Sequence, residues 1–341
     1  ILKIIKSFGL GADVVSKGEL MIALKAGIKP DKIVFSGVGK TIEELKFAID
    51  RKIFLINAES ESEILEIEKL AKSKNIKVKI GIRLNPDTDA NTISKISTGK
   101  KENKFGVNLQ TFIKILNKYK ESNYIKMSCL SVHIGSQITS HKPFKKMLSI
   151  IKKSIQKSNH SFEYIDLGGG MGIKYSNKDK KLNYKIYCKL IEKFLKSFNS
   201  RIIFEPGRSI IGNAGVIISK IIYIKQTPKI DFIIMDAAMN DLIRPALYGT
   251  NHSIIPLHKK NTRISKKYEF VGPICETTDK FMLTKSYQKL KQNDYLIICD
   301  VGAYGMVLSS NYNLRPKAVE ILVKNSKLKI IKKRQSITDI I

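Results

Sequence analysis

Short apolar runs alternate with amphipathic segments over the chain up to residue 205. The runs are rich in Ile and Val and are predicted to be buried strands, whereas apolar positions between them recur at helical spacing. This alternation is typical of strand–helix units that repeat around a parallel sheet. The predicted strands are 12–15, 33–35, 53–56, 78–84, 125–133, 164–167 and 202–205.

Two of the predicted helices have start signals of their own. Thr41 with Glu44 and Ser60 with Glu63 each fit a capping box, in which the two side chains satisfy free backbone donors. Another helix is predicted at 2–8, with no strand before it. Seven strands and one more expected ahead of that helix make eight, the number that closes a TIM (β/α)8 barrel. An open doubly wound sheet is the alternative.

The pattern changes after about residue 215, where strands follow one another with turns between most of them. The predicted strands here are 216–225, 232–235, 268–271, 295–298 and 319–323. Such a series indicates a separate β-domain, a sandwich or a barrel. We therefore expect a fold of class α/β plus β, with a TIM barrel over 1–215 and a C-terminal β-domain over 216–341.

The chain carries 61 Lys and Arg against 30 Asp and Glu, a formal net charge of +31 at pH 7. Such an excess can indicate nucleic-acid binding. Here, however, only eight of the basic residues are Arg, the charge is spread along the chain, and no helix-turn-helix or array of stacking aromatics accompanies it. The composition favours an A/T-rich coding bias. We expect no nucleic-acid partner, although the positive field would attract acidic small molecules.

Hydrophobic runs and cysteine spacing give expectations about cellular location and about metal or disulfide sites. No run of 18 apolar residues predicts a membrane span and no cleavage-site pattern predicts a signal peptide, so we expect a cytoplasmic protein. The four cysteines, Cys129, Cys188, Cys275 and Cys299, show no CxxC spacing. We therefore expect neither a metal site nor a disulfide framework.

Three polar segments follow predicted barrel strands, at the face where TIM barrels carry their catalytic groups. His133 begins the segment HIGSQ, in which Ser136 could bind a phosphate. Gly168–Gly170 exposes backbone N–H groups that suit a phosphate. Glu205-Pro-Gly-Arg208 places an acid that could contact a heterocycle nitrogen near a guanidinium that could bind phosphate or carboxylate. A structural histidine, a tight turn and a surface ion pair are the respective alternatives.

Three further segments lie in the predicted β-domain. Arg244 and Tyr248 could hold a carboxylate by two kinds of hydrogen bond, and domain packing is the alternative. Cys275 followed by Glu276 could supply proton transfer beside an anchor for a charged group, and a buried thiol next to a surface acid is the alternative. Tyr304 is flanked by glycine, so its hydroxyl could reach into a crevice.

Nine motifs, in order along essentially the whole chain, resemble those of the diaminopimelate decarboxylases. This family shares its fold type with ornithine and arginine decarboxylases and alanine racemase. Nine ordered matches exclude coincidence. The motifs are GADVVSKGEL at 11–20, IVFSGVGK at 33–40, KFGV at 104–107, HIGSQ at 133–137, DLGGGMGI at 166–173, EPGR at 205–208, RPALYG at 244–249, GPICETTD at 272–279 and AYGM at 303–306.

The resemblance implies a barrel that binds pyridoxal 5'-phosphate (PLP), joined to a β-domain, in a homodimer with shared active sites. His133 would stack on the pyridine ring, Ser136 and Gly170 would hold the phosphate, and Glu205 would pair with the protonated ring nitrogen. A protonated ring is the electron sink for the electron pair left when CO2 departs. Asp13 would lie near the cofactor lysine. The implied cofactor contacts are His133, Ser136, Gly169, Gly170, Glu205, Pro206, Gly207, Arg208 and Tyr304.

The resemblance also implies the substrate contacts. Cys275, supplied across the dimer interface, would be the catalytic acid that protonates the carbanion. Glu276 would hold the distant amino end of the substrate. Ornithine-type enzymes usually have aspartate there, so Glu276 favours meso-2,6-diaminopimelate, converted to L-lysine and CO2 in the last step of lysine biosynthesis. An ornithine- or arginine-type decarboxylase and a catalytically dead regulatory homologue are the alternatives. The implied substrate contacts are Arg208, Arg244, Tyr248, Glu276 and Tyr304.

One family segment is missing from the printed sequence. Family members carry their Schiff-base lysine in a tyrosine-alanine-x-lysine-alanine-asparagine segment just before the helix at which this chain begins. Lys3 and Lys6 lie in a different context. The resemblance therefore implies that the sequence is an N-terminally incomplete part of a longer gene product, and we expect this fragment to be inactive by itself.

Overall fold

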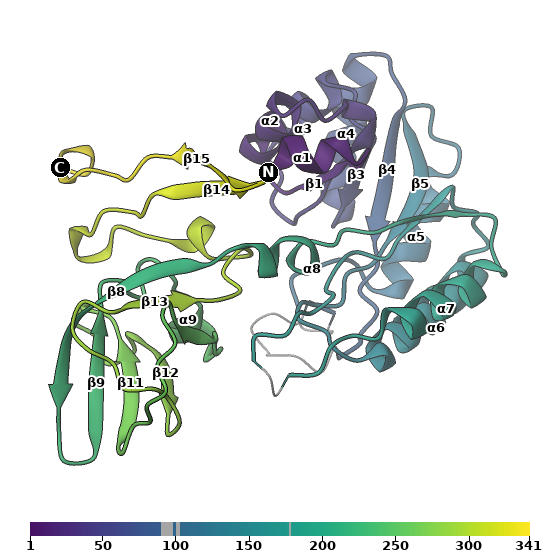
Figure 1. The fold of residues 1–341 in the computed structure, drawn as a ribbon. Helices are drawn as coiled ribbons and strands as arrows, with labels where there is room; N and C mark the ends of the chain where they lie inside the picture. The colour runs from purple at the N-terminus through teal and green to yellow at the C-terminus, as the bar shows by residue number, and fades with distance from the viewer. Residues whose placement is uncertain (90–97, 100–102, 177–178) are drawn as a thin grey trace. The chain divides into compact units, whose positions relative to one another are not determined.

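The computed structural model describes residues 1–89, 98–99, 103–176 and 179–341 (Figure 1). These residues form two compact units. Unit 1 comprises Ile1–Gly172 and Lys181–Pro206, and unit 2 comprises Ile173–Lys180 and Gly207–Ile341. Each unit has its own hydrophobic core. The limits expected from the sequence for two domains, 1–215 and 216–341, stay a prediction.

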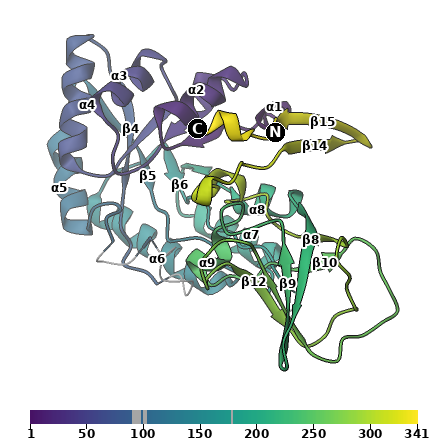
Figure 2. The same ribbon diagram turned by 90° about the vertical axis from the view of Figure 1, so that its left-hand side faces the viewer.

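Unit 1 is built on a seven-stranded sheet in which every neighbouring pair is parallel. The strands lie in chain order, without the reversal of a doubly wound sheet, so that alternative is wrong. This arrangement confirms the predicted TIM-barrel type of fold (Figure 1, Figure 2). The strands are β1 (Ala12–Val14), β2 (Ile33–Phe35), β3 (Leu55–Ala58), β4 (Val78–Arg83), β5 (Ile125–Ser131), β6 (Tyr164–Asp166) and β7 (Arg201–Ile203).

The helices α2 to α7 connect or flank these strands and bury apolar residues in the core of unit 1, whereas α1 precedes β1 and has no buried residue. The capping box predicted at Thr41 is confirmed, since Thr41 Oγ1 accepts from Glu44 N–H (3.2 Å) and Glu44 Oε2 accepts from Thr41 N–H (3.0 Å). The helices of unit 1 are α1 (Leu2–Ser7), α2 (Lys17–Lys25), α3 (Ile42–Asp50), α4 (Glu61–Ser73), α5 (Leu109–Tyr119), α6 (His141–Ser158) and α7 (Tyr184–Leu195).

The capping box predicted at Ser60 is only half right. Ser60 Oγ accepts from Glu63 N–H (3.2 Å) as expected. The Glu63 carboxylate, however, accepts from Glu59 N–H (2.9 Å) and from the buried Lys40 ammonium (2.6 Å). The Lys40 ammonium thus occupies Oε1 of Glu63, and Oε2 bonds the N–H of the residue before Ser60 in place of that of Ser60 itself.

Four predicted strand limits in unit 1 are wrong by two residues, those at 53, 56, 133 and 205, and the last two matter for the site. The strand predicted at 53–56 begins at Leu55, because Ile53 N–H still bonds Ala48 O at the end of α3. Strands β5 and β7 end at Ser131 and Ile203, two residues before the limits predicted at 133 and 205. His133 and Glu205 therefore stand in the loops beyond the carboxyl edge of the sheet, where TIM barrels carry their active sites.

Unit 2 contains a six-stranded sheet in the order β10-β13-β8-β9-β11-β12, and a β14-β15 hairpin. All neighbouring pairs are antiparallel except β9 and β11. The predicted β-rich second part is confirmed. The strands are β8 (Ile217–Gln226), β9 (Ile230–Met235), β10 (Ile254–Pro256), β11 (Lys267–Val271), β12 (Lys280–Thr284), β13 (Tyr295–Ile298), β14 (Glu320–Lys324) and β15 (Lys327–Lys332).

Three strands of unit 2 were not predicted from the sequence: β10, β12 and β15. The first is only three residues long, and β15 is exposed along its length with lysine at half of its positions, so neither has a buried apolar pattern.

Two short helices, α8 (Arg208–Ile211) and α9 (Arg244–Tyr248), also belong to unit 2. No helix among the described residues is both long and apolar enough to cross a bilayer. The 3-10 turns are η1 (Pro30–Lys32), η3 (Gly212–Ala214), η4 (Met306–Leu308), η5 (Tyr312–Leu314) and η6 (Ile337–Asp339).

Candidate active site

The glycine loop after β6 can be built only from glycine. A Cβ on Gly169 would lie 2.1 Å from Glu205 O, and a Cβ on Gly170, whose φ is +90°, would lie 2.3 Å from Gly135 O. Side chains are therefore excluded from the surface of this loop. Gly168 N–H donates to Asp166 Oδ1 (2.9 Å), which fixes how the loop leaves the strand. Backbone N–H groups in such a turn form a concave cradle for an anion.

The loop after β5 lies beside the glycine loop. Ile138 N–H donates to Gly170 O (2.8 Å) and Gly172 N–H donates to Ile138 O (3.0 Å), which continues the parallel pairing of β5 and β6 beyond the sheet. This pairing brings the segment that contains His133 and Ser136 next to Gly168–Gly170. The two segments that the sequence marked as phosphate binders thus converge in unit 1.

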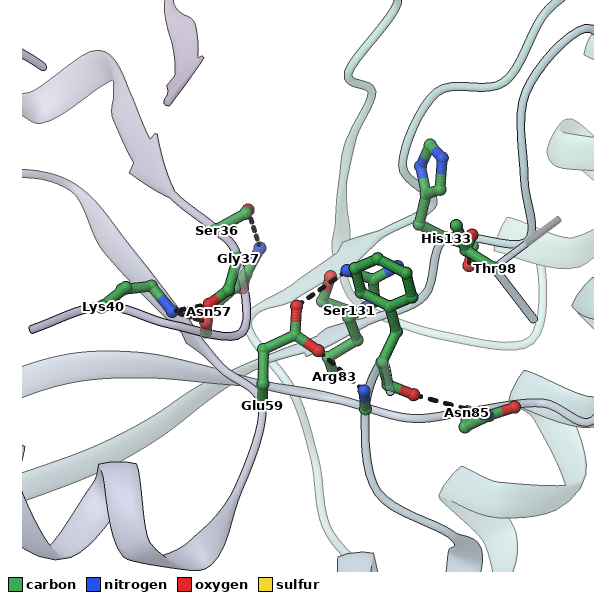
Figure 3. A network of polar contacts seen from close by, with 12 residues as sticks. Ser36, Gly37, Lys40, Asn57, Glu59, Arg83, Asn85, Thr98, Ser131 and His133 are labelled. Atoms are coloured by element: carbon green, nitrogen blue, oxygen red, sulfur yellow. Dashed lines mark hydrogen bonds and ion pairs between the residues drawn. The ribbon is translucent and has the colours of Figure 1, made fainter. Parts of the chain in front are cut away.

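His133 is held as a neutral imidazole. Its Nδ1 accepts from Gly169 N–H (3.2 Å), so the ring proton belongs on Nε2. Burial of the ring, aided by the positive charge of Arg83, lowers the pKa of His133 to about 4. Thr98 Oγ1 also donates to the backbone carbonyl of His133 (3.0 Å; Figure 3). A neutral, oriented ring of this kind can pack on a heterocycle without adding charge.

Three carboxyl groups gather at the same edge of the sheet. Asp166 is fully buried, and Glu205 Oε1 is buried without a hydrogen-bond donor among the described residues. Burial raises the pKa of Asp166 and, with repulsion from Asp166 and Asp13, raises the pKa of Glu205 well above its usual range. Asp13, the middle residue of β1, keeps part of its surface exposed, and the partial loss of hydration of its carboxyl group raises its pKa to about 7. Such pairs of perturbed acids are typical of functional sites.

A polar network ties the segment after β2 to β3, α4 and β6 (Figure 3). The Lys40 ammonium is buried and donates to Gly37 O (2.7 Å), Asn57 O (2.8 Å) and Glu63 Oε1 (2.6 Å). Asn57 Nδ2 in turn donates to Ser36 Oγ (3.3 Å) and to Asp166 Oδ2 (2.9 Å). The lysine of the motif IVFSGVGK thus fixes the edge of the sheet that carries the carboxyl groups.

A buried ion pair holds the next strand of that edge. Arg83 Nη1 donates to Glu59 Oε1 (2.8 Å), Glu59 Oε2 accepts from Gly106 N–H (2.7 Å), and the guanidinium lies 4.6 Å from the Phe105 ring centre (Figure 3). Gly106 and Phe105 belong to the motif KFGV. The motif therefore closes a loop onto the end of β4.

In unit 2, Arg208 and Arg244 share one aromatic partner. Arg208 Nη1 donates to Tyr175 Oη, and its guanidinium lies 4.8 Å from the Tyr304 ring centre. Arg244 is almost fully buried and lies 4.4 Å from the Tyr175 ring centre. Tyr304 is exposed, with a left-handed backbone (φ 58°). The contact between Arg208 and Tyr304 was not predicted from the sequence, and their roles toward cofactor and substrate stay predictions. Tyr248, at the end of α9, is partly exposed.

A histidine orients Arg244. His252 Nδ1 lies 2.8 Å from Cys299 O, which can only accept, so Nδ1 carries the proton and Nε2 accepts from Arg244 Nη1 (2.8 Å). Burial, together with the nearby arginines, lowers the pKa of His252 to about 4. The ring stays neutral at pH 7 and keeps Arg244 in place.

Cys275 and Glu276 lie in the loop between β11 and β12, and both are exposed. Glu276 Oε1 accepts from Tyr312 Oη (2.6 Å) and Oε2 accepts from Thr278 Oγ1 (3.0 Å), which lowers the pKa of Glu276. Neither Cys275 nor Glu276 makes a hydrogen bond, ion pair or ring contact with Arg244, Tyr248 or Tyr304 in the described part of the chain. The exposed thiol contradicts the buried-cysteine alternative.

The loop of Cys275 is held from inside by Asp279. Its two carboxylate oxygens accept from Met239 N–H (2.7 Å) and Ile274 N–H (2.8 Å). A Cβ on Gly272 would lie 2.3 Å from this carboxylate, so the motif needs glycine there. Asp279 was not among the predicted site residues, although it closes the motif GPICETTD.

Other contributors were missed because each is a single polar residue just outside a motif. Tyr175, His252 and Tyr312 are of this kind, and nothing local in the sequence marks them. Asp166 opens the motif DLGGGMGI, which was a usable signal. Pro206 and Gly207 lie where expected, between Glu205 and α8, and Gly207 is the residue before that helix.

Two features of unit 1 fit PLP. The glycine loop at Gly168–Gly170 offers backbone N–H groups without side chains for a phosphate, Ser136 lies in the neighbouring loop, and the buried oxygen of Glu205 that has no donor is suited to a protonated ring nitrogen. Within reach of both stands a neutral imidazole, since Gly169 N–H bonds His133. The donor set therefore matches a flat phosphorylated heterocycle.

Known proteins resemble this chain over nearly its whole length. Residues 1–212 match the family model described as pyridoxal-dependent decarboxylase, pyridoxal binding domain. The diaminopimelate decarboxylase of Zymomonas mobilis is 42% identical over 97% of this chain and 79% of its own length. That of Aquifex aeolicus is 40% identical over 98% of this chain and 80% of its own.

Solved structures agree with these matches. Diaminopimelate decarboxylase from Helicobacter pylori complexed with L-lysine superposes with a TM-score of 0.92 at 38% identity, covering 99% of this chain and 85% of that one. A Chlorella virus arginine decarboxylase bound to agmatine superposes with a TM-score of 0.78 at 20% identity, which shows the fold alone. The chain belongs to the diaminopimelate decarboxylase family of pyridoxal-dependent decarboxylases.

Proposed function

We propose that this protein converts meso-2,6-diaminopimelate to L-lysine and CO2 with PLP as its cofactor. The observation that carries the proposal is the convergence, in unit 1, of the glycine loop, the neutral His133 and the donor-less carboxyl oxygen of Glu205. The family relatives named diaminopimelate decarboxylase support the choice of substrate, as does the L-lysine in the Helicobacter pylori structure.

When bound, PLP supplies the electron sink for decarboxylation. Residues of unit 1 bind the cofactor and keep its ring protonated. Glu205 keeps the ring nitrogen protonated, His133 packs against the ring through its neutral face, and Ser136 with Gly169 and Gly170 binds the phosphate. Pro206 and Gly207 set the backbone that follows Glu205, and Tyr304 and Arg208 of unit 2 complete the cofactor contacts.

The substrate contacts come from unit 2. Arg208, Arg244 and Tyr248 bind the polar groups of diaminopimelate, and Tyr304 lines the same region. Arg244 is pre-oriented by His252 and Tyr175, so little side-chain entropy is lost when a carboxylate binds it.

Cys275 delivers the proton to the substrate carbon after CO2 has left, and Glu276 binds the distant ammonium group. The exposure of both side chains supports a role toward a neighbouring protomer of a homodimer. The hydrogen bonds from Tyr312 and Thr278 keep Glu276 ionised, as an ammonium partner must be. We place the enzyme in the cytoplasm, in a lysine-producing step.

The test measures CO2 release by the full-length gene product, numbered as here, from meso-diaminopimelate, ornithine and arginine. We expect meso-diaminopimelate to be preferred by at least about a hundredfold in kcat/KM, because a missing partner for Glu276 and the arginines leaves buried or bound charges unpaired. Faster release from ornithine or arginine would refute the substrate assignment.

Two variants separate the roles of the neighbouring residues. Glu276→Gln should raise KM for diaminopimelate on the order of tenfold or more, with a smaller effect on kcat, because uniform binding of the ammonium is lost. Cys275→Ala should instead lower kcat by about a hundredfold or more with KM nearly unchanged, as expected for loss of a general acid. The same effect from both variants would contradict the division of labour.

A further inference from the structure

Backbone bonds from Leu167 N–H to Ile203 O (3.0 Å) and from Glu205 N–H to Gly168 O (2.9 Å) hold the segments after β6 and β7 side by side, which brings the carboxyl groups of Asp166 and Glu205 into contact. This contact has a chemical requirement. Asp166, at the end of β6, is fully buried, and the Oε1 atom of Glu205 is buried without a donor in the described residues. Two ionised carboxylates offer only acceptors. The contact therefore needs a proton between the two groups, and burial makes a second negative charge costly.

The surrounding donors decide which group carries that proton. Asp166 accepts from Gly168 N–H (2.9 Å), Asn57 Nδ2 (2.9 Å) and Ser131 Oγ (3.2 Å). Three donors stabilise its ionised form. Glu205 receives no such support at Oε1, so the proton resides mainly on Glu205, which donates it to Asp166.

Each strand that faces the pair supplies a defined group. Asp13 on β1 adds negative charge, Arg83 on β4 adds positive charge, and the fully buried thiol of Cys129 on β5 stays protonated because burial raises its pKa. Arg83 is already paired with Glu59 at 2.8 Å. No lysine, arginine or histidine is paired with Asp166 or Glu205 among the described residues. A proton shared by the two carboxyl groups therefore relieves the repulsion that these more distant charges leave.

We propose that Asp166 is a positioning residue for Glu205, and that the two carboxyl groups share one proton and present a single negative charge to the ring nitrogen of PLP. One negative charge matches the one positive charge of a protonated ring. Asp166, braced by Asn57 and Ser131, also fixes the orientation of the Glu205 carboxyl group. The inference that the proton is shared depends only on residues of unit 1. The inference that the pair binds the ring nitrogen of PLP depends on the proposed function.

Infrared spectroscopy of the full-length protein without cofactor tests the shared proton. A protonated carboxyl has a C=O stretch separate from that of a carboxylate, and exchange into D2O shifts it. We expect the wild type to keep one protonated carboxyl at about pH 8, far above the value of about 4.3 at which glutamic acid ordinarily titrates. Glu205→Gln should lose this band. Asp13→Asn is the matched control and should keep it.

Asp166→Asn separates a shared proton from burial alone. The asparagine keeps the size of the side chain but removes the nearest negative charge, so the pH at which the band is half lost should fall by at least about one unit. Absence of the band from the wild type at about pH 8, or an unchanged midpoint in Asp166→Asn, would overturn the shared proton. If Asp166→Asn does not fold, Ser131→Ala serves instead: loss of a donor to Asp166 should raise the midpoint, and an unchanged midpoint would overturn the proposal.

Spectroscopic titration with PLP tests the role toward the cofactor. Asp166→Asn should weaken PLP binding on the order of tenfold, in the range expected for a lost charge-assisted hydrogen bond. Unchanged affinity would overturn the positioning role. Because both measurements are made without substrate, a failure to decarboxylate diaminopimelate would overturn the proposed function and leave the shared proton standing.

Discussion

Replacing Lys40 by methionine should destabilise unit 1 more than any surface substitution. The Lys40 side chain is fully buried, and its ammonium donates to Gly37 O, Asn57 O and Glu63 Oε1. Methionine fills much of the same volume but supplies no donor. The Glu63 carboxylate, only 8% exposed, would lose its cation. Breaking a buried pair from one side costs about 3–5 kcal/mol, because an uncompensated charge stays behind.

Equilibrium urea unfolding, followed by circular dichroism at fixed protein concentration, measures this loss. Lys69→Met is the matched control, because Lys69 pairs with Glu66 at the same 2.6 Å but is 69% exposed. That control should change the free energy of unfolding by less than about 0.5 kcal/mol.

A double variant isolates the reason for the effect. Lys40→Met with Glu63→Gln should be more stable than Lys40→Met alone, since an amide tolerates burial without a cation better than a carboxylate does. A loss below about 1 kcal/mol in Lys40→Met, or no recovery in the double variant, would refute the reasoning from burial.

Three further predictions follow from close contacts. Gly169→Ala places a Cβ 2.1 Å from Glu205 O, so it should lower PLP affinity by about tenfold or more, as measured by equilibrium dialysis, and normal binding would show that the loop can shift. His252→Phe removes the acceptor of Arg244 Nη1 and should raise KM for diaminopimelate several-fold with less effect on kcat, whereas equal losses in both would contradict a binding role. His133 and His252 have folded-state pKa values of about 4, below the value of about 6.5 in an unfolded chain, so their neutral forms favour folding. The free energy of unfolding should therefore fall as the pH drops from about 6.5 toward 4. Assigned NMR resonances of His133 or His252 that titrate near 6.5 would refute this.

The sequence anticipated those parts of the site that lie within single motifs. The glycines of DLGGGMGI, the sequence EPGR, and His133 stand at strand ends because a buried apolar strand must leave the sheet through a polar turn. Alternation of strands and helices was enough to predict a parallel sheet in chain order. Strand ends were less predictable, since Val132 and Phe204 are apolar and yet lie beyond the last paired residue.

The sequence could not show how distant polar residues pair. Asn57 and Asp166 are 109 residues apart, Arg244 finds its acceptor in His252, and Glu276 is held by Tyr312 from 36 residues away. None of these partners has a local signal, because a hydrogen bond across a fold depends on which strand ends or loops the topology places side by side. Their pKa values depend on the same packing.

The sequence by itself determined which chemical groups are available and on which elements they sit: a glycine-rich turn, an imidazole, an acid after β7, and a cysteine beside a glutamate. Only the tertiary structure decided their states. Parallel pairing of seven strands brings Asp13, Asp166 and Glu205 to one edge of the sheet, where loss of hydration and mutual repulsion raise their pKa values. Apolar periodicity is a local property of the chain, whereas desolvation and charge repulsion arise only when remote segments share one low-dielectric space.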